Sequence, residues 1–234
     1  MRLRPALALA LVLPFSFALG WVSGVERWPP SDQLIAWFRG RPTRPQQRQE
    51  LLRNVRPSQV VVVGDSITAE GLWAEYFNPA LSVANRGFPG ATTADLLALL
   101  PVITAPRARL YLVMAGVNDV LYASWGPEQT VSNLLALRRK LLAFGPGVKV
   151  VIQSTLECLP PQCSDQALER IRTINHGLEQ SLPSDDFLDL NAVLSSPRGL
   201  RRSLTYDGFH LNAKGYAAWR SLLEAGPLNG RDNR

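Results

Sequence analysis

The sequence is poor in residues that bind metals. Its 234 residues include two histidines and two cysteines, and neither histidine falls near the cysteines at the spacing of zinc ligands. The chain has no G-x-x-x-x-G-K sequence for holding nucleotide phosphates, no internal repeat of fixed period and no low-complexity tract. These absences argue against a metal centre, a P-loop nucleotide-binding protein and a repeat protein.

Acidic residues are fewer than basic ones. The chain has 19 Asp and Glu against 25 Lys and Arg, a formal net charge of +6. Part of the excess lies between residues 39 and 56, where only Glu50 opposes Arg39, Arg41, Arg44, Arg48, Arg53 and Arg56. The stretch lacks interleaved aromatics and any nucleic-acid motif, so we expect no nucleic-acid partner. Contact with anionic lipid headgroups and a plain solvated face both remain open.

The N-terminus is typical of an export signal. Arg2 and Arg4 precede a run from Pro5 to Trp21 that carries no charge. Ala18 and Gly20 are small residues suited to a cleavage site, yet an apolar run of this length can also span a bilayer. We therefore expect an exported protein, periplasmic or extracellular. Cleavage of the segment, and its retention as a membrane anchor through residues 1–21, both stay open.

The two cysteines lie close together in Cys158-Leu159-Pro160-Pro161-Gln162-Cys163. In an exported protein, a pair inside a proline-containing loop most simply forms a local disulfide. We therefore predict a bond between Cys158 and Cys163.

Strand-like and helix-like runs alternate after about residue 56. The apolar or β-branched runs bounded by turn residues are Val60–Val63, Leu81–Ala84, Arg109–Met114, Val148–Gln153 and Phe187–Leu190. Runs with helical spacing lie at about Leu72–Phe77, Thr93–Leu100, Pro127–Phe144, Asp165–Leu182 and Ala213–Glu224. The alternation predicts a doubly wound three-layer α/β/α domain with a five-stranded parallel sheet, and a ligand site beyond the carboxyl ends of its strands.

A candidate nucleophile and its base stand at opposite ends of this domain. Gly64-Asp65-Ser66 follows the first strand directly, which places a serine hydroxyl at a strand-to-helix turn. A serine needs a base that is itself oriented by a third group. Asp207 and His210, three residues apart, can supply both. We interpret His176 as a surface or packing histidine, because no carboxylate stands at matching spacing.

Two further motifs can supply oxyanion donors. Gly87, in Asn85-Arg86-Gly87-Phe88-Pro89-Gly90, follows the second strand, and Asn118, in Gly116-Val117-Asn118-Asp119, follows the third. The N–H groups of Gly87 and Ser66 and the Asn118 amide suit a developing oxyanion. Each motif also has a structural interpretation as a tight turn or helix cap. Their occurrence in one order, each at a strand end, favours the catalytic interpretation.

Together these motifs resemble the SGNH hydrolases, also called GDSL lipases or esterases, over about residues 58 to 226. The resemblance implies Ser66 as nucleophile, His210 as base and Asp207 as the acid that orients it. It also implies that Ser66, Gly87 and Asn118 form the oxyanion hole. The resemblance further implies a flavodoxin-like fold, no cofactor, and hydrolysis of esters or thioesters, with lipids, acetylated glycans or small esters as substrates. It does not identify the substrate.

The expected organisation is a signal or anchor over residues 1–24, a basic tether with a short helix over 25–57, the catalytic domain over 58–226 and a tail over 227–234. The alternatives are an inactive hydrolase-like scaffold and a phosphate- or glycan-binding module of the cell envelope, since a helix N-terminus after a glycine turn can bind anions. Against phosphate binding, Asp65 puts a carboxylate where the anion would lie.

Export is testable by fractionating cells that express the full chain. Because Arg2 and Arg4 precede the uncharged run, we expect the protein outside the cytosol and associated with the outer face of a membrane. A free N-terminus near residue 21 would establish cleavage. A wholly cytosolic, unprocessed chain would contradict the prediction.

Overall fold

The computed structural model of the chain describes residues 44–229, and the export segment, most of the tether and the end of the tail lie outside the described residues. The chain divides into two units, Met1–Asn54 and Val55–Arg234. The described part of the first unit is residues 44–54, of which Arg44–Arg53 form helix α3. No helix in the described part of the chain is long and apolar enough to cross a membrane.

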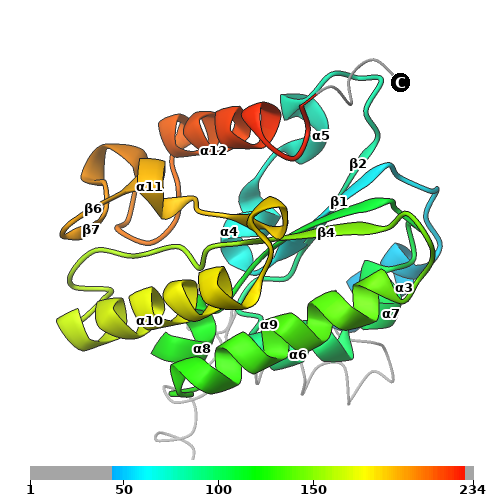
Figure 1. Cartoon of the computed structure of the whole chain (residues 1–234). Coiled ribbons are helices and arrows are strands. Elements are labelled where there is room, and N and C mark those ends of the chain that lie inside the picture. The colour runs from blue at the N-terminus through cyan, green and yellow to red at the C-terminus, as the bar shows by residue number, and fades with distance from the viewer. Residues whose placement is uncertain (1–43, 230–234) are drawn as a thin grey trace, which may run out of the picture. The chain divides into compact units, whose positions relative to one another are not determined.

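The second unit is built around one parallel sheet, as the sequence predicts (Figure 1). Its five strands run in the order β2-β1-β3-β4-β5, the flavodoxin-like order of doubly wound folds. Their bounds are β1 (Val60–Gly64), β2 (Val83–Gly87), β3 (Leu110–Met114), β4 (Lys149–Gln153) and β5 (Phe187–Leu188). A separate antiparallel pair, which the sequence did not predict, consists of β6 (Ser195–Ser196) and β7 (Gly199–Leu200).

Helices cover both faces of the sheet. The helices near the start and middle of the unit are α4 (Ser66–Glu70), α5 (Trp73–Tyr76), α6 (Thr93–Ala98), α7 (Leu100–Ile103), α8 (Val117–Leu121) and α9 (Pro127–Leu142). The later ones are α10 (Asp165–Ser181), η1 (Ser184–Asp186), α11 (Asn191–Leu194), η2 (Arg202–Leu204) and α12 (Ala213–Ala225). Figure 1 shows α5 and α12 on one side of the sheet and α6, α9 and α10 on the other.

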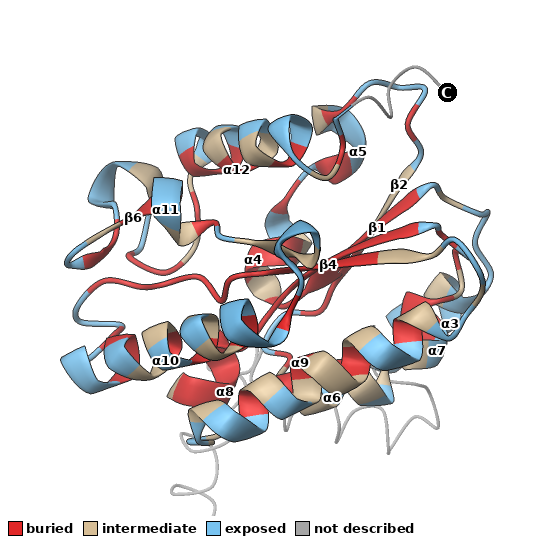
Figure 2. Ribbon diagram, viewed as in Figure 1, coloured by how far each residue is buried: buried red, intermediate tan, exposed pale blue. Residues whose placement is uncertain are grey.

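The central strands form the core. Every residue of β1 and β3 is buried, and these strands are continuously apolar because they are covered on both faces (Figure 2). Edge strand β2 is only partly buried and carries Asn85 and Arg86. Because β2 is only weakly apolar, the apolar run Leu81–Ala84 predicts a strand that begins two residues before the observed start at Val83.

The register of the sheet gathers the motif segments at one edge. Gly64, the last residue of β1, pairs with Gly87 on one side and Met114 on the other. The three strands therefore end at the same level, and the chain beyond each of them enters the same region. This is the edge where a doubly wound sheet places its ligand site.

Candidate active site

Ser66 is positioned by the turn between β1 and α4. Asp65 caps the helix, and its Oδ1 accepts the N–H of Ile67 at 3.0 Å. A Cβ on Gly64 would stand 2.1 Å from the carbonyl oxygen of Met114, so only glycine allows this close approach between neighbouring strands. Ser66 is the first residue of α4 and half-buried.

The far end of α4 is held by side chains from three other segments. The indole of Trp73 donates to the carbonyl of Thr68 at 2.8 Å, and the Tyr216 hydroxyl donates to that of Ile67 at 2.6 Å. The Asn85 amide lies 3.1–3.2 Å from the carbonyls of Thr68, Ala69 and Gly71. These bonds satisfy carbonyls that a five-residue helix cannot pair internally, and they fix the helix that carries Ser66.

Asp207 and His210 lie on one tight loop. The Oδ2 of Asp207 is 2.7 Å from the Nδ1 of His210, and its Oδ1 accepts the backbone N–H groups of Phe209 at 2.8 Å and His210 at 2.7 Å. The Thr205 hydroxyl accepts the N–H of Gly208 at 2.9 Å and donates to the carbonyl of His210. The carboxylate therefore orients the imidazole from a loop that is itself pinned at both ends.

The structure brings Ser66 and His210 into contact. The Oγ of Ser66 lies 3.0 Å from the Nε2 of His210, across 144 residues of sequence. With its proton on Nδ1 and directed at Asp207, the imidazole can accept the serine proton at Nε2. His176 lies on the exposed surface of α10.

Asn118 also reaches this region. It is 2% exposed, and its Nδ2 donates to the carbonyl of Ala91 at 2.9 Å. No other described group takes up the second N–H of this amide, which remains available to a ligand.

Gly87 does not occupy the place predicted from the sequence. Its N–H donates to the Oδ1 of Asn85 at 2.8 Å, and the residue is not among those lining the cavity around Ser66. The reason is local: Gly87 is still the last residue of β2, and the Asn85 side chain folds back along the strand to take up its N–H.

Gly90, from the same motif as Gly87, lies in the turn beyond β2. The N–H of Ala91 donates to the carbonyl of Phe88 at 3.0 Å, and Gly90 has φ +77 after Pro89. This is a type II turn, in which proline is common at the second position and the third requires a positive φ, which glycine adopts readily. Gly90 lines the cavity, and no hydrogen bond among the described residues takes up its N–H. The Pro89-Gly90 dipeptide is the sequence signal that could have predicted this turn.

A cavity of about 490 Å³ opens beside Ser66. Polar side chains and backbone form part of its wall, and apolar groups form the rest. Its lining consists of Ser66, Gly90, Asn118, Leu121, Tyr122, Gln162, Asp207, Phe209 and His210.

Two buried acids adjoin site residues in the sequence, Asp65 next to Ser66 and Asp119 next to Asn118. Burial raises the pKa of Asp65 to about 7, although the Ile67 N–H and the nearby His210 oppose the shift. Burial also raises the pKa of Asp119, against hydrogen bonds from Thr93 and Thr130. Asp207 differs. Burial acts to raise its pKa, but the hydrogen bonds from His210 and Phe209 outweigh it, so this pKa is lowered and the carboxylate stays ionised.

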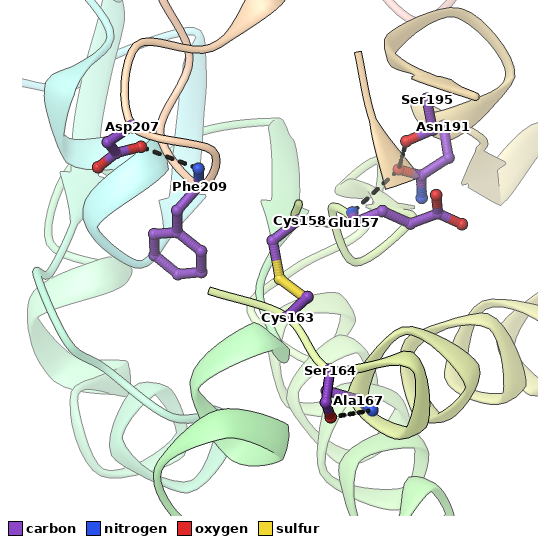
Figure 3. The surroundings of a disulfide bond; sticks show 9 residues. All are labelled: Glu157, Cys158, Cys163, Ser164, Ala167, Asn191, Ser195, Asp207 and Phe209. Atoms are coloured by element: carbon purple, nitrogen blue, oxygen red, sulfur yellow. Dashed lines mark hydrogen bonds between the residues drawn. A yellow bond between two sulfur atoms is a disulfide. The ribbon is translucent and has the colours of Figure 1, made fainter. Parts of the chain in front are cut away.

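A disulfide joins Cys158 and Cys163 next to the base loop. The N–H of Leu159, inside the bridged segment, donates to the carbonyl of Gly208 at 2.8 Å, and Gln162 from the same segment lines the cavity. Figure 3 shows the disulfide between the turn of Asp207 and Phe209 and the start of α10. The bridged segment thus forms one wall of the site.

The fold and site together define an α/β domain with a hydroxyl, an imidazole and a carboxylate in contact at the carboxyl edge of its sheet. The model of the GDSL-like lipase/acylhydrolase family matches residues 62–218. The chain belongs to this family, which confirms the resemblance seen in the sequence and places the protein among ester-hydrolysing enzymes.

Solved structures share the fold. A Streptococcus pneumonia protein provisionally described as a platelet activating factor is 22% identical, with a TM-score of 0.69, covering 88% of this chain and 98% of its own. A GDSL-like lipase from Bacteroides thetaiotaomicron is 21% identical, with a TM-score of 0.61 and coverage of 86% and 95%. An acetylxylan esterase from Geobacillus stearothermophilus is 16% identical, with a TM-score of 0.57 and coverage of 73% and 94%. A comparison with curated proteins gives no significant match.

The pKa of Asp65 predicts a pH-dependent stability. The folded state raises it from 3.8 to about 7, so between about pH 4 and pH 7 the native protein binds more protons than the unfolded chain, and stability falls as pH rises. Asp65→Asn keeps an N-cap acceptor but has no proton to lose. We expect its Tm, relative to wild type, to be higher at about pH 8 than at about pH 5.

The control for this experiment is Asp185→Asn, which removes an exposed carboxylate. The Tm difference between Asp185→Asn and wild type should change far less between about pH 5 and pH 8 than the difference for Asp65→Asn. A Tm difference for Asp65→Asn that stays constant between the two pH values would contradict the prediction.

The disulfide predicts a modest gain in stability. The bridge spans a sequence separation of 5, and a loop this short constrains the unfolded chain by about 2 kcal/mol. We expect the double variant Cys158→Ser, Cys163→Ser to lose about that much free energy of unfolding in urea titration. Two free thiols in the unfolded, unreduced wild-type protein would show that the bond is absent.

Proposed function

We propose that this protein hydrolyses carboxylic esters through an acyl-enzyme formed on Ser66, with His210 as general base and acid and Asp207 as the orienting carboxylate. The observation that carries the proposal is the unbroken chain from Ser66 Oγ to His210 Nε2 at 3.0 Å and from His210 Nδ1 to Asp207 Oδ2 at 2.7 Å. Each group lies within the reach that proton transfer requires.

The reaction divides into two steps. The Oγ of Ser66 attacks the ester carbonyl while its proton passes to Nε2 of His210. The imidazolium, stabilised by Asp207, then gives that proton to the departing alcohol oxygen, and the C–O bond breaks. Water attacks the acyl-serine in the second step, with His210 again accepting and returning the proton. The products are the carboxylic acid, the alcohol and the free enzyme.

The oxyanion of both steps needs preorganised donors, and Gly90 replaces Gly87 in this role. We assign the second N–H of the Asn118 amide and the backbone N–H groups of Gly90 and Ser66. Support comes from the placement of all three residues around one cavity, and from the engagement of the Gly87 N–H by Asn85. A donor of this kind contributes on the order of 2.7–4 kcal/mol to transition-state stabilisation.

The proposal predicts strongly non-additive variants. Ser66→Ala and His210→Ala should each lower turnover of a short-chain aryl ester by about 10⁴-fold or more. All assays are run without added metal, because the groups assigned to the reaction all belong to the protein. The double variant should lose little more, because residues that act as one unit are not additive. Steady-state kinetics of purified, folded variants measures this.

His176→Ala is the matched control and should keep wild-type turnover, since this histidine lies on the exposed surface of α10. Asn118→Ala should lower turnover by roughly 10²–10³ and still let Ser66 react slowly with a fluorophosphonate. Wild-type esterase activity in folded Ser66→Ala would refute the mechanism.

A further inference from the structure

A second carboxylate faces the reacting nitrogen of His210. Glu70 is the last residue of α4, four positions after Ser66, so both side chains lie on one face of the helix. Its Oε1 is 4.0 Å from the Nε2 of His210, the nitrogen that contacts Ser66. The Glu70 side chain is 42% exposed and therefore open to a ligand.

Tyr206 holds this carboxylate. Its hydroxyl lies 3.3 and 3.2 Å from the two carboxylate oxygens of Glu70, and its ring stacks on that of His210 with centroids 5.8 Å apart and planes at 12°. Burial, followed by the charges of Glu70 and Asp207, raises the pKa of Tyr206 to about 12. The phenol therefore remains protonated and donates to Glu70, in a contact at the exposed rim of the site, where Tyr206 is 62% exposed.

The position of Glu70 relative to the cavity indicates which part of a substrate it meets. In the proposed reaction the ester carbonyl points toward Asn118 and Gly90. The leaving oxygen must lie next to Nε2 of His210 to receive its proton. Among the described residues, Glu70 is not part of the cavity lining that contains the oxyanion donors, yet it lies close to Nε2. It therefore flanks the alcohol portion of the ester.

We propose that Glu70 determines specificity for the alcohol by accepting a hydrogen bond from a hydroxyl on the carbon next to the ester-bearing carbon. This inference rests on the proposed function and deepens it. The substrates that fit are esters of polyhydric alcohols, such as a sugar or glycerol, because their hydroxyls stand beside the leaving oxygen. An alcohol that carries a negative charge at that position is repelled by the same carboxylate.

Matched esters of one acid test the proposal. The pair is 2-hydroxyethyl butyrate and 2-methoxyethyl butyrate, whose alcohols have similar electron withdrawal but differ in the donor. A hydrogen bond to a charged group favours the hydroxyl ester by on the order of ten- to a hundredfold in kcat/KM. The anionic ester carboxymethyl butyrate should be the poorest substrate. Monobutyryl glycerol and a monobutyryl methyl xyloside then distinguish a glycerol from a sugar substrate.

Variants then assign the preference to Glu70. In Glu70→Ala the ratio of the two kcat/KM values should fall to near one. Glu70→Gln keeps an acceptor without the charge, so it should keep part of the hydroxyl preference and lose the discrimination against carboxymethyl butyrate. Tyr206→Phe removes the hydroxyl that contacts Glu70, so it should lower the ratio of the two kcat/KM values severalfold. Each ratio compares two substrates on one enzyme preparation, so partial misfolding does not change it.

Glu75→Gln is the matched control, an exposed glutamate on the neighbouring helix α5, and it should keep the wild-type ratio. A wild-type ratio near one, or a wild-type ratio retained in Glu70→Ala, would overturn the inference. Fluorophosphonate labelling separates the two proposals. Labelled Ser66 without the alcohol preference leaves the hydrolase mechanism standing, whereas a wild-type protein that is not labelled at Ser66 overturns both.

Discussion

The contact between Ser66 Oγ and His210 Nε2 is the constraint on which the site depends, and it joins segments 144 residues apart. Neither segment is rigid by itself: one is a five-residue helix and the other a loop. The helix is fixed by side chains from other segments, and the loop is fixed by hydrogen bonds of its own. Asn85, Trp73 and Tyr216 hold the carbonyls of α4, and Thr205 closes the loop that carries the base.

The aromatic cluster behind α4 links this helix to the end of the chain. Trp73 packs edge-to-face against Trp219 with centroids 4.7 Å apart, and Tyr216 bonds to α4 from the same helix as Trp219. Asn212 starts that helix by accepting the N–H groups of Lys214 and Gly215. Helix α12 follows His210 directly, so the packing that anchors the serine helix also anchors the base.

The site keeps acids in contrasting environments. Asp65 is buried with one oxygen that has no hydrogen-bond partner among the described groups, whereas Asp207 is partly exposed and accepts three hydrogen bonds. Burial of a carboxylate oxygen without a hydrogen-bond donor favours the protonated acid, whereas hydrogen bonds donated to the oxygens favour the ionised carboxylate. Such divergence is characteristic of functional sites, where stability is given up for placement of charge. Glu70 adds a third carboxylate on the open side of His210.

The sequence by itself determined the layered fold, because buried parallel strands must be continuously apolar and the helices between them must be amphipathic. It also determined that Ser66 and Asn118 lie near one another, because both follow parallel strands that end at one edge. The base loop follows no strand of this sheet, so its place beside Ser66 was expected only from its chemistry and from the family resemblance. Local spacing could not decide between Gly87 and Gly90, since both are glycines after one strand. In the structure the Asn85 side chain takes up the Gly87 N–H, and this contact favours Gly90 as the donor in the proposed oxyanion hole. Glu70 and Tyr206 stand 136 residues apart in the sequence. Only the tertiary structure decided that they touch, because contacts between side chains so far apart in sequence follow from packing and not from any periodic pattern.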